Sequence, residues 1–354
     1  MKRLFLLLLI ALSAPLAAQT IDLPGPSTVA FEPLVNRSVD IGERLVAEAS
    51  MVSDKCGHYG EAEKASYARL VARGEGYYYD DLLADIDEWK KSPYLAGVRS
   101  IGTTVEEREI YELTITDPGS EGVPRHRVTI HARTHPHEIQ SSWVADAIIK
   151  FLLSDDPYAA LLRQNVRFHI YPMYNPDGVE RNSTRYNANG VDLEREWDKA
   201  VPEPEAAALK ARFDQLMKSE QPIEVALNLH SSSDPERYFW FHDENGTSAR
   251  FAELQRAYIA SVRESFAKIM PWDYRVSWKS AAPTHFPESW FWHNHGTGVM
   301  ALTYEEIFSQ TLESNGEDFI AAGRALLDGI GDYLQIRPTS VESALPAASP
   351  LDLR

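Results

Sequence analysis

A histidine and a glutamate three residues apart, His135 and Glu138, are the first residues of this sequence that could hold a metal ion. Imidazole and carboxylate are both zinc ligands, and a catalytic zinc takes three protein ligands, two histidines and one glutamate being a known set. The spacing alone is common. An acid in the first turn of a surface helix, stabilised by the helix dipole, would also explain it. The metal hypothesis therefore needs a third ligand.

The two compact zinc-protease motifs do not supply this ligand. A His-Glu-x-x-His motif beginning at His137 would need a histidine at Ser141, and a His-x-x-Glu-His motif beginning at His135 would need one at Ile139. The third ligand must therefore come from far along the chain. His230 follows a later apolar segment. A lone histidine at the end of a strand is more often structural, but the incomplete pair upstream favours a ligand.

Two arginines and two glutamates complete the candidate chemistry. Arg185 and Arg195 lie in one polar loop, and the guanidinium fork suits a carboxylate or a developing oxyanion, although ordinary surface ion pairing would also account for them. Glu305 and Glu306 end an apolar strand, where a carboxylate is costly unless it is solvated or used. Strand alternation puts them on opposite faces. Either could take a proton from a water that a metal ion activates.

The elements that must position these residues alternate between strands and helices. Hydrophobic periodicity predicts strands around 98–101, 110–116, 127–132, 166–173, 223–229 and 299–308, and helices around 80–91, 139–152, 203–217, 248–268 and 319–334. This alternation predicts an α/β sheet covered by helices on both faces. Ligands of such sheets gather at the carboxyl ends of the strands, which is where the candidate residues stand.

Composition and the chain ends limit the function and suggest a location. The chain has 354 residues, of which 44% are hydrophobic, and a net charge of -17, so nucleic acid and anionic membranes are poor partners. Residues 1–18 combine Lys2 and Arg3 with a short apolar run and predict a signal peptide, hence a secreted or periplasmic protein. That run is well short of the ~20 residues that span a membrane. We expect an N-terminal extension over 19–76, the main domain over 77–335 and a loose tail over 336–354.

Six short motifs, taken in order, resemble those of the zinc metallocarboxypeptidase family, the carboxypeptidase A-like peptidases, and are nearer to its bacterial and cytosolic branches. They are Gly102 with Glu107-Arg108-Glu109-Ile110, His135-Pro136-His137-Glu138, Asn175-Pro176-Asp177-Gly178, Gly190-Val191-Asp192-Leu193-Glu194-Arg195, His230-Ser231 and Thr303-Tyr304-Glu305. The resemblance covers roughly residues 77–335. It implies a three-layer α/β/α sandwich around a mixed, mostly parallel sheet.

The resemblance also implies roles for the candidate residues. One zinc ion would have three protein ligands: His135, Glu138 and His230. Glu305 falls at the position of the general base and is preferred to Glu306. Arg185 matches the arginine that polarises the scissile carbonyl and stabilises the oxyanion, and Arg195 matches the one that binds the terminal carboxylate. The implied activity is removal of C-terminal residues from a peptide or protein.

Three departures from the family pattern bear on substrate recognition. Glu194 stands where an asparagine usually precedes Arg195, and an acid there would repel a terminal carboxylate unless it is protonated or paired. His137 stands where related chains often have Gly or Arg. The flap tyrosine has no clear match, and five rings in its region could line the substrate pocket or pack in the core: His285, Trp290, Trp292, His293 and His295. Two alternatives therefore stay open, an amidase or endopeptidase that needs no free C-terminus and a catalytically silent binding module.

Overall fold

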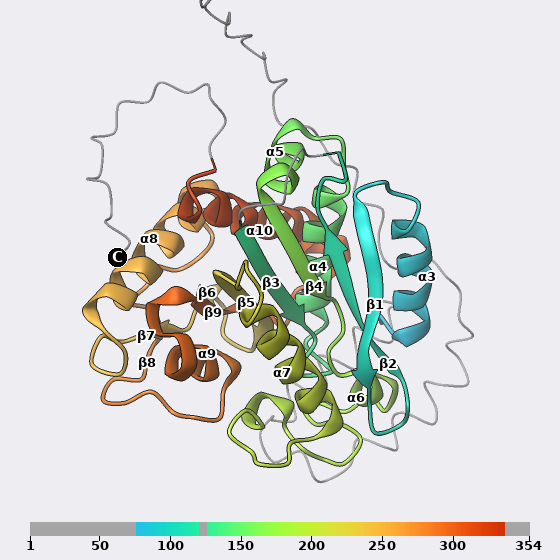
Figure 1. The fold of residues 1–354 in the computed structure, drawn as a ribbon, viewed down its shortest axis with the longest axis horizontal. Helices are drawn as coiled ribbons and strands as arrows, with labels where there is room; N and C mark the ends of the chain where they lie inside the picture. Colours follow the sequence, from blue (N-terminus) through green and yellow to red (C-terminus); the bar gives the residue numbers. More distant parts are fainter. Residues whose placement is uncertain (1–75, 120–125, 337–354) are drawn as a thin grey trace, which may run out of the picture. The chain divides into compact units, whose positions relative to one another are not determined.

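A seven-stranded sheet forms the centre of the computed structural model, which describes residues 76–119 and 126–336 (Figure 1). The strand order is β1-β2-β4-β3-β5-β9-β6. The strands are β1 (Leu95–Thr103), β2 (Glu109–Ile115), β3 (His126–Ala132), β4 (Val166–Tyr171), β5 (Val225–Ser232), β6 (Tyr238–Phe239) and β9 (Met300–Ile307). The central pairings β4-β3, β3-β5 and β5-β9 are parallel, and the outer pairings β1-β2, β2-β4 and β6-β9 are antiparallel. The predicted mixed sheet is confirmed, with its parallel pairings in the middle.

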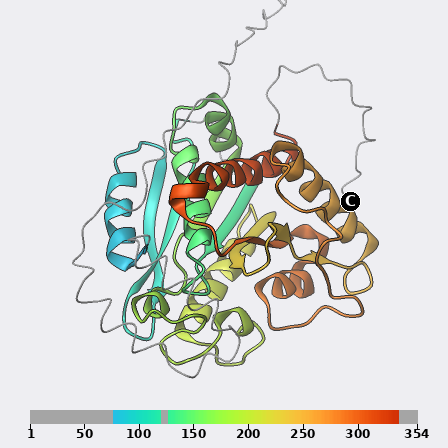
Figure 2. The ribbon, with the colours of Figure 1, turned by 180° about the vertical axis from the view of Figure 1, so that it is seen from behind.

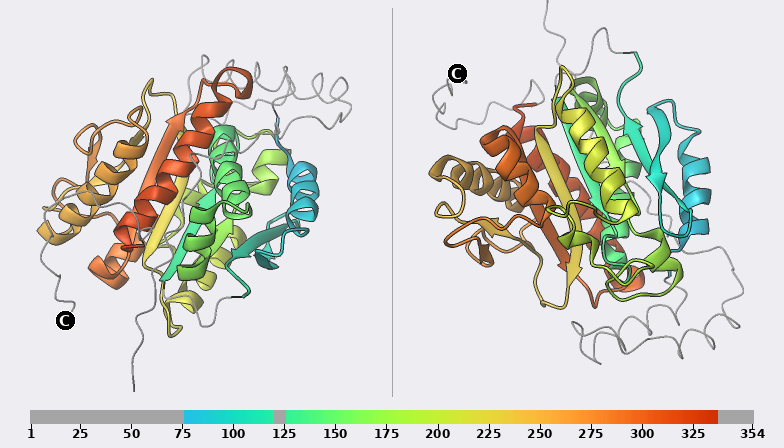
Figure 3. Two further views of the ribbon diagram at one scale, coloured as in Figure 1. Left: turned by 90° about the horizontal axis from the view of Figure 1, so that it is seen from above. Right: turned by 60° about the horizontal axis from the view of Figure 1, so that its bottom comes forward.

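Helices cover both faces of this sheet. On one face lie α3 (Tyr79–Trp89), α4 (Ile139–Leu152), α5 (Pro157–Asn165), α8 (Ala249–Ser265) and α10 (Leu312–Tyr333). Figure 2 shows α10 lying across α4, with α8 beside it. The opposite face is covered by α7 (Pro204–Met217) and α9 (Pro287–His295), and Figure 3 shows α7 lying over the strands. The predicted three-layer arrangement is therefore confirmed.

Successive side chains of the central strands belong alternately to two hydrophobic cores, one on each face of the sheet. In β5, Leu227 belongs to the core under α4 and α10, whereas Ala226 belongs to the core under α7 and α9. In β9, Leu302 and Ala301 divide in the same way. Strands that are buried on both faces become nearly continuous apolar runs, which is the pattern that the sequence shows.

Several elements differ from those predicted. Helix α5 and helix α9 were not expected, and α10 begins at Leu312 instead of residue 319. The aromatic residues of α9 stand at consecutive positions, so no single apolar stripe marks it as a helix. The segment that reads as a tight turn, Asn175 to Gly178, begins the short helix α6 (Pro176–Glu180). Proline suits a first helical position, and the Asn175 Oδ1 accepts a hydrogen bond from the Gly178 N–H at 3.1 Å.

Shorter elements carry the loops around the sheet. They are η1 (Leu193–Arg195), η2 (Gly296–Gly298) and the two-stranded sheet of β7 (Phe241–His242) and β8 (Val276–Ser277). None of the helices within 76–119 and 126–336 is long and apolar enough to cross a membrane. The predicted signal peptide, N-terminal extension and tail lie outside the described residues, apart from residues 76 and 336 themselves, and the domain boundaries stay predictions.

Candidate metal centre and active site

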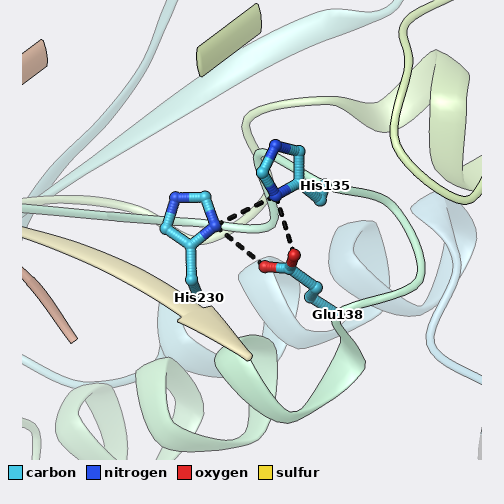
Figure 4. A group of neighbouring side chains, drawn as sticks. All are labelled: His135, Glu138 and His230. Atoms are coloured by element: carbon cyan, nitrogen blue, oxygen red, sulfur yellow. Dashed lines mark hydrogen bonds and ion pairs between the residues drawn. The ribbon is translucent and has the colours of Figure 1, made fainter. Parts of the chain in front are cut away.

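Three buried donor groups converge where β3 and β5 end, and Figure 4 shows how they face one another. The His135 Nδ1 lies 2.7 Å from the Glu138 Oε1, and the His230 Nδ1 lies 2.8 Å from the Glu138 Oε2. The two Nδ1 atoms are 3.1 Å apart. Each of the three residues is only 3% exposed. Two imidazole nitrogens and a carboxylate aimed at one point match the donor set that zinc prefers, so the predicted ligands are brought together and fit this ion.

The backbone between β3 and α4 is held in an unusual shape. Arg133 has a φ of 61°, a left-handed conformation that costs a non-glycine residue energy and is often found near functional sites. Its Nε donates to the carbonyl of Pro136 at 2.5 Å. From α6, the Asn175 Nδ2 donates to the Thr134 carbonyl at 3.0 Å. A Cβ at Gly178 would lie 2.4 Å from a side-chain carbon of Pro136, so this close approach requires glycine. The motif around Asn175 therefore supports the metal-binding corner.

Asp192 links His135, one of the candidate metal ligands, to both candidate arginines. Its Oδ1 lies 3.2 Å from the His135 Nε2, while its Oδ2 accepts hydrogen bonds from the Nε of Arg185 at 2.7 Å and of Arg195 at 3.2 Å. Burial acts to raise the pKa of Asp192, but His135 and Arg185 hold it well below its ordinary value. A carboxylate on the outer ring nitrogen orients a histidine ligand. The sequence analysis missed Asp192, although it lies in the motif that contains Arg195.

The two glutamates of β9 have different surroundings. Glu305 pairs in register with His230 and lines the cavity, and its Oε1 accepts a hydrogen bond from the Trp240 Nε1 at 3.0 Å. Its Oε2 has no hydrogen-bond partner among the described residues, and burial raises its pKa to about 7. Glu306 turns into the core, where the Arg237 Nε lies at 2.6 Å and the Tyr304 hydroxyl donates at 2.9 Å. Of the two, Glu305 is the one in reach of a substrate.

A cavity of about 420 Å³ opens beside the three donor groups. Its wall includes Arg185 and Arg195, with Trp278, Phe286 and Glu288. The five rings that replace the flap tyrosine are not among its lining residues. Two of them pack elsewhere: Trp290 against Trp197, and Trp292 against Phe251. His137 is also buried, with its ring 4.8 Å from that of Phe308.

The carboxylate of Glu194 is directed to the end of β5. Both of its oxygens accept from the Asn228 Nδ2, at 3.0 and 3.1 Å, and its Oε2 lies 3.4 Å from the His230 Nε2. On the other side of the same amide, the Glu288 Oε1 accepts at 3.0 Å. The acid that departs from the family pattern is thus paired inside the protein. Sequence analysis gave no signal for Asn228 or Glu288.

Comparison with known proteins decides the family. The zinc carboxypeptidase profile, peptidase family M14, matches residues 82–319. The chain belongs to the zinc carboxypeptidase family. Human cytosolic carboxypeptidase 6 is 28% identical over 257 residues, which cover 70% of this chain and 51% of the relative. The metallo-carboxypeptidase of Burkholderia cenocepacia has a similar structure, with a TM-score of 0.64, 26% identity, and coverage of 74% of this chain and 70% of that one.

The chain spans about half the length of the human relative that it matches. Cytosolic carboxypeptidase 3 of Bos taurus is 31% identical over 163 residues, which cover 45% of this chain but 16% of the bovine one. Family and structural relatives together indicate a zinc metallopeptidase. Carboxypeptidases of this family use one zinc ion, and the cluster of His135, Glu138 and His230 could bind it, so the predicted cofactor is confirmed at the level of the family.

The prediction of a secreted or periplasmic protein is wrong. Curated relatives that match include cytosolic carboxypeptidases of human, Xenopus tropicalis and Bos taurus, which points to the cytosol. The signal-peptide prediction rested on two cations before a short apolar run. That pattern is compositional and involves no packed structure, so it is a weak guide to where a protein works.

Proposed function

We propose that this chain is a metallocarboxypeptidase that removes C-terminal residues from peptides or proteins. The observation that carries the proposal is the convergence of His135, Glu138 and His230 beside Glu305 in one cavity. Zinc bound by the first three residues would act as a Lewis acid, lowering the pKa of a water and polarising the substrate carbonyl. The catalytic unit would be the predicted domain of residues 77–335.

Glu305 would serve as the general base. Because Trp240 holds its Oε1, the Oε2 is the oxygen that would accept the proton of the attacking water. Glu305 would then pass this proton to the leaving amine, so that one carboxylate acts first as base and then as acid. Glu306 cannot take this role from where it stands, because its carboxylate is engaged with Arg237 and Tyr304 on the other face of β9.

The two arginines would divide the substrate between them. Arg185 is mostly buried, and its bond to Asp192 leaves its guanidinium oriented at the cavity wall, as a donor to a developing oxyanion requires. Arg195 is about half exposed on the same wall and suits the terminal carboxylate of a peptide. The pairing of Glu194 with Asn228 reduces the repulsion that this carboxylate would otherwise meet.

The proposal is tested with peptides made in pairs, each with a free and with an amidated C-terminus, and with products identified by mass. The zinc-loaded protein should release single C-terminal residues from the free forms only. Glu305→Gln, which keeps the size of the side chain and loses the base, is the control for contaminating peptidases.

Other outcomes would replace the proposal. Cleavage of both forms, or at internal bonds only, would favour the amidase or endopeptidase. Zinc binding without cleavage of any peptide would favour the binding module on the same fold.

A further inference from the structure

We propose that Glu194 is a positioning residue for His230, whose outer ring nitrogen it faces, and that one short segment therefore orients both histidines of the metal centre. This inference rests on the proposed zinc site and assigns to Glu194 a role other than contact with the substrate.

The geometry of the segment Asp192-Leu193-Glu194 is the first argument. Leu193 is fully buried, and the two acids beside it reach the two rings separately. Asp192 lies 3.2 Å from the His135 Nε2, and Glu194 lies 3.4 Å from the His230 Nε2. The Nδ1 atoms of the same rings face each other across 3.1 Å. Each imidazole thus has one nitrogen toward the metal position and the other toward a carboxylate.

The burial of Glu194 is the second argument. Its side chain is only 8% exposed, and a buried carboxylate is costly unless it is paired. Within the described residues, its close side-chain partners are the neutral Asn228 amide and the His230 ring. The next polar group along is a second acid, Glu288, on the same amide. Among these close side-chain partners, the His230 ring is therefore the one that could offer Glu194 a polarised N–H.

The position of Glu194 would favour one tautomer of the His230 ring, and this affects metal binding. A neutral histidine carries one ring proton, and a hydrogen-bond acceptor beside the Nε2 favours the form whose Nδ1 lone pair is open. The spacing of 3.4 Å is longer than a full hydrogen bond, so attraction between the Glu194 carboxylate and the polarised N–H of the ring would supply most of the effect. An asparagine at position 194 would be one methylene shorter and uncharged. The acid at this position would thus strengthen metal binding.

Zinc affinity is the measurement that tests this role, made by competition with a chromophoric chelator. Glu194→Gln removes the charge and keeps the size, and we expect it to weaken zinc binding by about 10- to 100-fold. Glu288→Gln is the matched control, because Glu288 is similarly buried and shares the Asn228 amide, while its described hydrogen bonds and ion pairs do not include His230. It should bind zinc within about threefold of the unsubstituted protein.

Thermal unfolding with and without zinc separates positioning from stability. A ligand that binds only the folded state raises Tm by an amount that grows with the logarithm of its affinity at a fixed ligand concentration. The rise in Tm on adding zinc should therefore shrink in Glu194→Gln and persist in Glu288→Gln. A merely structural role would lower both Tm values of Glu194→Gln equally.

Each result has a definite meaning. Unchanged zinc affinity in Glu194→Gln, or equal loss in Glu288→Gln, would overturn this inference alone, provided that the unsubstituted protein binds zinc and cleaves peptides. Failure of the unsubstituted protein to bind zinc would overturn the proposed function as well.

Discussion

Two regions beside the cavity differ in how closely they keep the family pattern. The metal corner, formed by His135, Glu138 and His230, has at every position the residue that the family pattern implies. The acidic wall, formed by Glu194, Asn228 and Glu288, has an acid where the family usually has an amide. The corner must satisfy an ion that accepts few donor types and one geometry. The acidic wall has only to keep its own buried polar groups hydrogen-bonded, so different residue types can occupy its positions.

The two regions also differ in what holds them. The corner is attached to the ends of β3 and β5 in the central sheet and to the N-cap of α4, which packs on that sheet. The wall joins η1, β5 and α9, which meet through a single amide, the Asn228 Nδ2. Burial, aided by the charge of Glu194, raises the pKa of Glu288 to about 7. We expect substitutions at the corner to abolish the metal site. Substitutions along the acidic wall should leave the site in place and change its affinity for zinc or the choice of substrate.

The largest effect is expected from His230→Ala, which removes one of three donors to the metal. Zinc content of the purified protein, measured by elemental analysis, should fall to background. The matched control is His137→Gln, which changes a histidine beside Glu138 whose ring packs on Phe308. Retained zinc in His230→Ala, or loss in the control, would break the assignment of the corner.

Replacing the base should stop turnover while sparing the metal. Glu305→Gln should keep its zinc and lose about 10²- to 10⁴-fold in kcat, the usual contribution of a positioned base. Glu306→Gln changes the adjacent residue isosterically. Because Glu306 pairs with Arg237 in the core, this variant should lower Tm and keep most of its turnover. The opposite pattern would move the base to Glu306.

The arginines should separate catalysis from recognition. Arg185→Ala should lower kcat by about 10²- to 10³-fold, as the loss of an oxyanion donor does. Arg195→Ala should instead raise KM for peptides with a free C-terminus, lowering kcat/KM by about 10- to 100-fold. Steady-state kinetics on matched free and amidated peptides distinguishes the two. Equal effects of Arg195→Ala on both peptides would show that Arg195 does not bind the terminal carboxylate.

The smallest effect is expected at Trp240, which contacts the base and not the metal. Trp240→Phe keeps an aromatic ring and removes the hydrogen bond to the Glu305 Oε1. A bond to a charged group is worth about 1.5–3 kcal/mol. We expect the lower end of this range, about a tenfold fall in kcat, because the Oε2 and not the Oε1 would accept the proton, and we expect zinc affinity to be unchanged. A loss of zinc in this variant would show that the corner depends on its surroundings more than the contacts indicate.

The sequence alone predicted the class of fold, and it proposed the three candidate ligands that the structure brings together. Hydrophobic periodicity, which is a local property of the sequence, locates the strands and helices. It therefore places His135 and Glu138 at a strand-to-helix junction and His230 after an apolar strand. A different local pattern was misleading at the N-terminus. There, two cations before a short apolar run predicted export, which the cytosolic relatives contradict.

The tertiary structure alone decided which polar groups meet. Alternation put Glu305 and Glu306 on opposite faces, but only the packing of α7, α9 and β6 around β9 shows which face borders the cavity. The bond from Trp240 to Glu305 joins residues 65 positions apart, and that from Asn228 to Glu194 joins residues 34 apart. Side-chain contacts of this range follow from how layers pack, and no periodicity along the chain records them. The candidate metal ligands could therefore be predicted from the sequence, whereas the side chains that contact them could be identified only in the folded chain.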